Sequence, residues 1–151
     1  ISDVDFRQKN FLEDIKIAKG LVDNGMKIIS KVETKSAVDN LTGILNEVEF
    51  ILVDRGDLST EVGLEKIPSY QRFILDKAVF YNKKVFLATQ FLKNMEVNPI
   101  PTIPEVIDLY HTLKSGIYGI QMSEETAVGS YPVECLGMIV RLMDEIDSEI
   151  K

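Results

Sequence analysis

Charged and hydroxyl side chains stand where short apolar runs of this chain end. Lys31 and Glu33 lie in the run 27–33, and residues two apart on an extended strand share one face. A lysine inside an apolar run is unusual unless it is paired. Two interpretations stay open: a structural ion pair at a strand end, or a catalytic pair at the carboxyl end of a parallel strand, where α/β folds place their sites.

A second carboxylate follows the next apolar run. Asp57 belongs to the segment Val53-Asp-Arg-Gly-Asp-Leu58, in which we expect Gly56 to let the backbone turn tightly and present its N–H groups. We expect Asp57 to lie within reach of Glu33. Two carboxylates from neighbouring strand ends predict a hard-oxygen site for Mg²⁺ or Mn²⁺. The alternative is an Asx-type turn that holds no metal.

Two hydroxyl residues complete the candidate set. Thr89 follows the apolar run that begins near position 85 and can donate to a substrate carboxylate, although alone it is an ordinary threonine. Ser123 ends the last apolar run. His111 has no metal-ligand partner nearby, and Cys135 is predicted to be a small helix core residue. The sequence contains no Walker loop and no GxGxxG motif.

The elements that must position these residues alternate between two types. Apolar runs without polar alternation predict parallel strands covered on both faces, and amphipathic stretches between them predict helices. The expected strands are 1–6 (weak), 27–33, 49–54, 84–90 and 118–123. The expected helices are 12–22, 38–48, 70–78, 106–113 and 132–146. This order predicts an α/β fold of parallel βα units.

Several residues predict where the helices begin and end. Gly25, Asn82 and Gly116 stand where helices should end and are predicted to be left-handed C-caps. The loop 98–104 is expected to lead into a helix at Glu105, with Thr102 as a predicted N-cap and Pro104 as a predicted first-turn residue.

The length and the net charge of the chain limit which folds and which binding partners are possible. We expect residues 1–151 to form one domain; because a complete (β/α)8 barrel takes about 250 residues, the chain is at most a little over half a barrel, or a small doubly wound sheet. The net charge of −7 opposes binding to nucleic acid or anionic lipid. We expect no membrane span, no signal peptide and no internal disulfide. The chain starts at Ile1, which suggests a fragment or the ordered part of a longer protein.

Taken in order, six segments resemble the pyruvate kinase family, with no detectable insertion between Lys31 and Glu134. The segments are Lys27-Ile-Ile-Ser-Lys-Val-Glu33, Val53-Asp-Arg-Gly-Asp-Leu58, Leu64-Glu-Lys-Ile-Pro68, Ala88-Thr-Gln90, Asn98-Pro-Ile-Pro-Thr102 and Met122-Ser-Glu-Glu-Thr-Ala127 with Gly129-Ser-Tyr-Pro-Val-Glu134. The resemblance implies a partial TIM barrel, namely strands four to eight of the family's catalytic (β/α)8 barrel.

The resemblance also implies roles for the candidate residues. It makes Lys31 a catalytic residue that stabilises an enolate, and Glu33 and Asp57 the ligands of Mg²⁺ or Mn²⁺. It assigns the substrate to the N–H groups of Gly56 and Asp57 and to the hydroxyl of Thr89, which also counts as catalytic. Ser123 is assigned to substrate binding.

The chain departs from the family pattern around the phosphates. The resemblance implies that the family's first three barrel strands, lid domain and regulatory domain lie outside these 151 residues, so we expect the monovalent-cation site not to be encoded in this chain. Cationic groups are lost and carboxylates are gained, and we therefore expect ADP to bind worse. The residues that differ from the family's own are Asp3, Asp5, Asp54, Ser59, Ile103, Glu124 and Val128.

These observations favour an enzyme but leave the question open. The first hypothesis is metal-dependent enolate chemistry on phosphoenolpyruvate, pyruvate or a related 2-oxo acid, with phosphoryl transfer if the missing barrel half is supplied. The alternative is a non-catalytic half-barrel module that acts by assembly, because open sheet edges and an apolar face invite pairing. We expect the protein to be cytoplasmic and to assemble either with copies of itself or with a complementary chain. We expect neither nucleic acid nor a membrane as a partner. The natural substrate and the role of Asp54 stay open.

Overall fold

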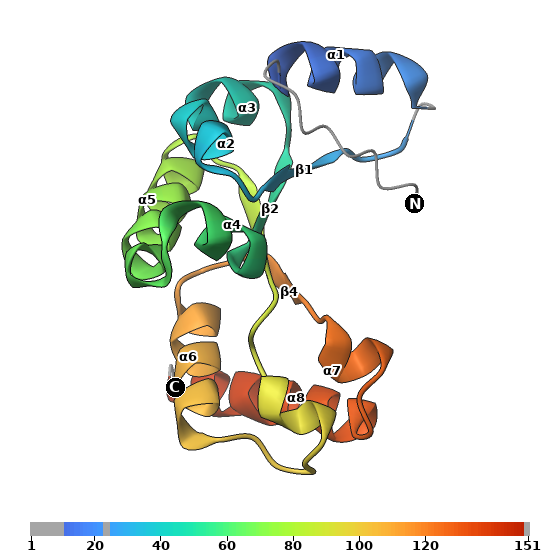
Figure 1. Cartoon of the computed structure of the whole chain (residues 1–151), viewed down its shortest axis with the longest axis vertical. Coiled ribbons are helices and arrows are strands. Elements are labelled where there is room, and N and C mark those ends of the chain that lie inside the picture. Colours follow the sequence, from blue (N-terminus) through green and yellow to red (C-terminus); the bar gives the residue numbers. More distant parts are fainter. Residues whose placement is uncertain (1–10, 23–24, 150–151) are drawn as a thin grey trace. The chain divides into compact units, whose positions relative to one another are not determined.

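Four strands form the sheet in the computed structural model, which describes residues 11–22 and 25–149. They are β1 (Ile29–Val32), β2 (Phe50–Asp54), β3 (Lys84–Ala88) and β4 (Gly119–Gln121). Hydrogen-bonded neighbours follow the order β1-β2-β3-β4, which is also the order along the chain. Helices separate successive strands along the chain (Figure 1), so the predicted α/β fold of parallel βα units is confirmed. The sheet is not closed, as is expected of a partial barrel.

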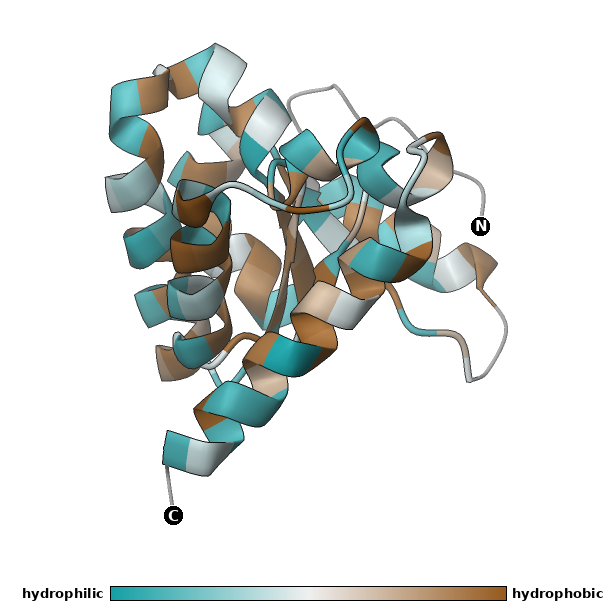
Figure 2. Cartoon of the chain, turned by 90° about the horizontal axis from the view of Figure 1, so that it is seen from below, coloured by the Kyte–Doolittle hydropathy of each residue, from teal (hydrophilic) through white to brown (hydrophobic). Residues whose placement is uncertain are grey.

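Four of the five expected strands are present, each somewhat shorter than its apolar run. The fifth, over residues 1–6, lies outside the described residues, as do Asp3 and Asp5. All five residues of β2 are buried, as expected for a strand that is covered on both faces. In Figure 2 the strands are mainly hydrophobic, whereas the helices carry both hydrophobic and hydrophilic residues.

The chain divides into two compact units, Ile1–Phe86 and Leu87–Lys151, and β3 crosses the boundary between them. The expectation of one domain over 1–151 stays a prediction. In the first unit, helices precede β1, connect β1 to β2 and follow β2 along the chain. The core of this unit contains Ile44, Ile51 and Ile74, all fully buried. These helices are α1 (Phe11–Leu21), α2 (Lys35–Asp39), α3 (Leu41–Glu47), α4 (Arg55–Val62), the 3₁₀ turn η1 (Leu64–Lys66) and α5 (Ile67–Phe80).

The second unit is built mainly from helices. They are the 3₁₀ turn η2 (Lys93–Glu96), α6 (Ile103–Lys114), α7 (Glu124–Ala127) and α8 (Pro132–Glu149). Its core includes Phe91, Leu109 and Cys135. Cys135 is fully buried, as predicted, and burial raises the pKa of its thiol, as do nearby carboxylates. His111 lies exposed on α6.

Most of the predicted helix ends are confirmed. Asn82 follows α5 with φ of 52° and Gly116 follows α6 with φ of 78°, both in the left-handed region. Thr102 precedes α6, and its N–H and Oγ1 both donate to Glu105 Oε2, at 2.7 and 2.8 Å. The helix therefore begins at Ile103, two residues earlier than Glu105.

The expected tight turn at Gly56 is wrong, because this residue lies in the first turn of α4. The apolar pattern offers little sign of this helix, since Leu58 and Val62 are the two apolar side chains of α4. It begins where the Asp54 carboxylate accepts the N–H of Asp57, as an N-cap does. A second difference is that the stretch 38–48 is not one helix, because α2 and α3 separate at Asn40.

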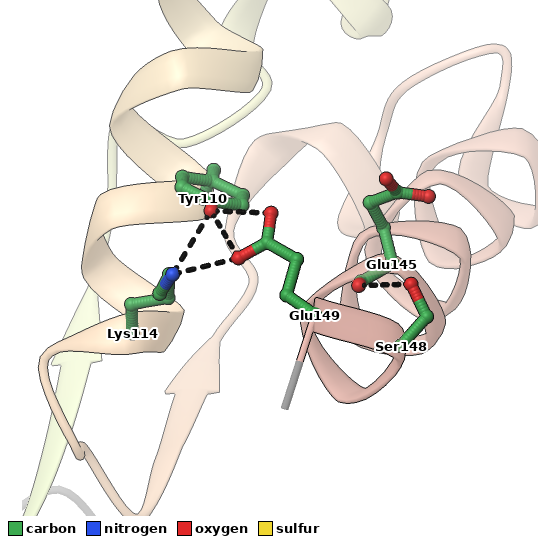
Figure 3. Close-up of polar contacts among 5 residues, drawn as sticks. All are labelled: Tyr110, Lys114, Glu145, Ser148 and Glu149. Carbon is green, nitrogen blue, oxygen red and sulfur yellow. Dashed lines mark hydrogen bonds and ion pairs between the residues drawn. The ribbon is translucent and has the colours of Figure 1, made fainter. Parts of the chain in front are cut away.

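A cluster of three side chains joins α6 to α8 in the second unit (Figure 3). The hydroxyl of Tyr110 donates to Glu149 at 2.7 Å, and Lys114 Nζ lies 2.7 Å from Glu149 Oε2 and 3.1 Å from the tyrosine hydroxyl. Hydrogen bonds from Lys114 and Tyr110 hold the pKa of Glu149 below its usual value, and the hydrogen bond to Glu149 raises the pKa of Lys114.

This cluster predicts a pH-dependent contribution to stability. Because the pKa of Glu149 is lowered on folding, its contribution is present above the ordinary value of 4.5 and is lost as the pH falls through the folded pKa. We expect Glu149→Gln to lower the melting temperature slightly at pH 7, as is usual for an exposed pair, and to have no effect at strongly acid pH. Glu145→Gln, which changes the same charge on α8, is the control. A loss that is equal at both pH values would contradict the prediction.

The loop before α8 depends on a glycine, which predicts a stability effect. A Cβ at Gly129 would lie 2.5 Å from the carbonyl oxygen of Glu125 and 3.2 Å from Cα of Glu96. We expect Gly129→Ala to lower the free energy of unfolding by about 1–3 kcal/mol because backbone must move. Gly137→Ala, inside α8, meets only a flexible arginine at 3.4 Å and should raise it by about 0.5–1 kcal/mol. Urea unfolding measures both; equal effects would refute the packing argument.

Candidate functional site

The register between β1 and β2 brings the charged residues of the first unit together. The two strands are parallel, with Lys31 opposite Leu52 and Val32 opposite Val53. Glu33 and Asp54 are the next residues along the two strands. Both therefore stand at the carboxyl ends of adjacent strands, which is where α/β proteins place their sites.

Lys31 pairs with both of these carboxylates. Its Nζ lies 2.7 Å from Glu33 Oε2 and 3.5 Å from Asp54 Oδ2. The other oxygen of Asp54, Oδ1, accepts the N–H of Asp57 at 3.2 Å. Glu33, Asp54 and Asp57 each offer a carboxylate oxygen, and these oxygens lie within 4.8 Å of one another. The predicted pairing of Lys31 with Glu33 and the predicted nearness of Asp57 to Glu33 are thus both observed.

Burial and charge act in opposite directions on Lys31. Its side chain is 46% exposed, whereas those of Glu33 and Asp54 are 28% and 12% exposed. Partial burial by itself lowers the pKa of Lys31, but the hydrogen bond and charge of Glu33, together with the charges of Asp54 and Asp57, outweigh it and raise the pKa above its usual value. The ammonium therefore stays charged at neutral pH.

The N-terminus of α4 adds a further positive element. Asp57 lies in the first turn of this helix, directly after Gly56. First-turn N–H groups have no partner within their own helix, and the helix dipole favours negative charge there. In this chain the Asp54 carboxylate accepts the Asp57 N–H and so occupies one of these donors.

The donor set fits a divalent metal ion. Mg²⁺ and Mn²⁺ prefer oxygen ligands, and three carboxylates converge here. Glu33 Oε2 is also a buried atom, and it faces the Lys31 ammonium at 2.7 Å. Such an atom is costly unless a charge compensates it. Glu33 and Asp57, the predicted ligands, are therefore joined by Asp54.

Asp54 is the site residue whose role the sequence left open. From the sequence, its carboxylate could belong to a second metal site or lie in solvent. In the structure it contacts Lys31 and caps α4. A signal was available, because an aspartate three residues before Asp57 has the spacing of a helix N-cap. The pairing with Lys31, by contrast, depends on strand register.

Thr89 belongs to the second unit and directly follows β3. Its φ is 68° and that of Gln90 is 60°, both in the left-handed region. A β-branched residue rarely adopts this conformation, which is strained and concentrated at functional sites. The predicted role of Thr89 in binding a substrate carboxylate stays a prediction, and its backbone conformation is compatible with a functional position.

Ser123 also belongs to the second unit, where its backbone N–H takes part in a hydrogen bond at the start of α7. It does not end a strand: β4 ends at Gln121, and Ser123 is the N-cap of α7. Its N–H donates to Glu125 Oε2 at 2.9 Å, and Glu125 is only 1% exposed. No pattern in the sequence singles out this buried glutamate. The assignment of Ser123 to substrate binding stays a prediction.

Charged residues at the carboxyl ends of neighbouring parallel strands define a site of the (β/α)-barrel class. Comparison with known proteins narrows this class to one family. The family model of the pyruvate kinase barrel domain matches residues 3–136. The chain therefore belongs to the pyruvate kinase family, as its motifs predicted.

Individual relatives agree with this assignment. Pyruvate kinase of Thermotoga maritima is 34% identical over 157 aligned positions, which cover 100% of this chain and 34% of the relative. That of Clostridium acetobutylicum is 36% identical and matches 91% of this chain and 30% of its own length. The crystal structure of pyruvate kinase from Pyrobaculum aerophilum has a TM-score of 0.86 at 31% identity, covering 89% of this chain and 33% of its own.

The chain thus spans about a third of the length of the curated relatives it matches. Among the described residues, none of the helices combines the length and the apolar character needed to cross a bilayer.

The backbone of Thr89 predicts an unusual response to mutation. Asparagine tolerates the left-handed region, so Thr89→Asn should raise the free energy of unfolding by about 1 kcal/mol. Thr89→Val keeps the branched Cβ and with it the strain, and should be no more stable than the parent chain. Thermal unfolding of the three proteins makes the comparison. Equal stability of the two variants would show that strain at this position is unimportant.

Proposed function

We propose that this chain carries the metal-and-enolate part of a pyruvate-kinase-like site and acts on phosphoenolpyruvate, pyruvate or a related 2-oxo acid. The observation that carries the proposal is the convergence of the Lys31 ammonium with the carboxylates of Glu33, Asp54 and Asp57 at adjacent strand ends. Relatives named pyruvate kinase support it.

In this proposal Glu33 and Asp57 hold a Mg²⁺ or Mn²⁺ ion. When bound, the ion acts as a Lewis acid on the oxygens of the 2-oxo acid. Lys31 Nζ, 2.7 Å from Glu33, presents a fixed positive charge next to that position. Loss of a methyl proton or of a phosphoryl group leaves negative charge on an enolate oxygen. A cation that is already in place stabilises this charge without reorganisation.

The substrate carboxylate is proposed to bind at the first turn of α4. The N–H groups of Gly56 and Asp57 lie in this turn, where anions are favoured. The substrate-binding role that the family resemblance implies for the hydroxyl groups of Thr89 and Ser123, which belong to the second unit, stays a prediction. Asp54 competes for the N–H of Asp57, so the substrate must share or displace that contact.

Phosphoryl transfer is proposed only when the rest of a barrel is supplied, because the chain spans about a third of its relatives. The position at which the family resemblance implies a lysine near the nucleotide phosphates holds Val128 here, which is 80% exposed. Without the charge of that lysine the phosphates of a nucleotide gain less electrostatic stabilisation. The cytoplasmic location predicted from the sequence remains part of this proposal.

A second candidate is the half-barrel module that acts through assembly. One observation favours it: α8 exposes four apolar side chains at heptad-like spacing. They are Val133 (76%), Leu136 (51%), Val140 (55%) and Met143 (50%). An exposed apolar stripe of this kind is suited to bind a second copy or a complementary chain.

Exchange of the methyl protons of pyruvate with deuterated water tests the enolate proposal without a nucleotide. We expect exchange, followed by NMR, to require Mg²⁺ and to fall by about 100-fold in Lys31→Met and in Glu33→Gln, since each removes a charge at the developing enolate. Lys35→Met is the matched control, because Lys35 pairs with Asp39 on α2 and should be dispensable.

Three outcomes would contradict this proposal. Mg²⁺-independent exchange would remove the assigned role of the metal, and equal rates in the Lys31 and Lys35 variants would remove the assigned role of Lys31. Absence of exchange in a folded parent chain, combined with self-association measured by analytical ultracentrifugation, would favour the assembly module instead.

A further inference from the structure

Asp54 is the most buried of the three carboxylates that converge at the strand ends. Its side chain is 12% exposed, and both its oxygens are engaged. Oδ1 accepts the N–H of Asp57 at 3.2 Å, and Oδ2 lies 3.5 Å from Lys31 Nζ. The residue therefore contacts two positive elements of the site, namely the Lys31 ammonium and the N-terminus of α4.

The Asp54 carboxylate changes the net charge of the cluster. One ammonium and three carboxylates leave the cluster with a net charge of −2. A divalent ion neutralises it fully. Without the Asp54 carboxylate, the same metal-loaded cluster would carry an excess positive charge. Charges a few ångströms apart interact strongly in a partly buried site, so this difference acts directly on an anionic ligand.

Asp54 also occupies the positive groups and hydrogen-bond donors that an anionic ligand would use. A ligand carboxylate at α4 meets an N–H that already donates to Asp54. A ligand charge next to Lys31 meets an ammonium that Asp54 and Glu33 already compensate. Each additional negative charge on a ligand is therefore compensated less well than it would be in a site with only two carboxylates.

We propose that Asp54 determines the ligand charge that the site accepts: it strengthens binding of the divalent ion, weakens binding of multiply charged anions, and selects a singly charged, unphosphorylated 2-oxo acid. This inference rests on the proposed function, since it presupposes the metal at Glu33 and Asp57. It narrows the substrate class, because a phosphorylated substrate carries more negative charge than the metal-loaded cluster balances.

Asp54→Asn tests the inference, because asparagine keeps the shape of the side chain and an oxygen that can accept the Asp57 N–H. We expect Mn²⁺ to bind about tenfold more weakly, measured as free Mn²⁺ by electron paramagnetic resonance. At saturating Mn²⁺ we expect oxalate, a dianion, to bind about tenfold more tightly, measured by water-proton relaxation. Pyruvate, a monoanion, should gain less. Asp76→Asn, which removes an exposed carboxylate paired with Arg72 on α5, should change neither affinity.

The opposite signs of the two effects separate a role in charge selection from a purely structural one. A variant that binds both Mn²⁺ and oxalate more weakly would have lost structure at the site, and this would overturn the inference. Unchanged affinities would overturn it as well. If the parent chain itself binds no Mn²⁺, the proposed function fails together with the inference; if the parent binds Mn²⁺ and only the Asn variant behaves unexpectedly, the inference alone fails.

Discussion

The parallel register of β1 and β2 is the constraint on which the site depends. It sets Lys31 opposite Leu52, and so makes Glu33 and Asp54 the residues that leave the sheet side by side. A shift of one residue would turn every side chain of β1 to the opposite face and separate the ammonium from the carboxylates. The buried apolar residues Val32 and Val53, opposite each other in this register, oppose such a shift.

Charge compensation then determines what the cluster can do. Lys31 makes the gathering of three carboxylates tolerable, because buried like charges are costly without a partner. The same arrangement leaves an excess of negative charge that suits a divalent ion. Asp54 links the strand end to α4 and therefore connects the stability of that helix with the electrostatics of the site.

The sequence predicted much of the fold because the relevant signals are local. Apolar runs located all four described strands, and Asn82, Gly116 and Thr102 marked helix ends through conformations that depend on a few neighbouring residues. The helix α4 was missed, since its short segment has few apolar residues and its start depends on a cap. The strain at Thr89 was equally invisible, because backbone conformation at one residue is imposed by the surrounding structure.

The sequence by itself determined the α/β class, the family, and the identity of Lys31, Glu33 and Asp57 as site candidates, because these are carried by residue types and by spacing along the chain. The tertiary structure alone decided that Asp54 joins them. Asp54 and Lys31 lie 23 positions apart in the sequence, and only the pairing of two strands brings their side chains to 3.5 Å. Interactions of this kind depend on strand register, and the local pattern of residues in either segment does not determine that register.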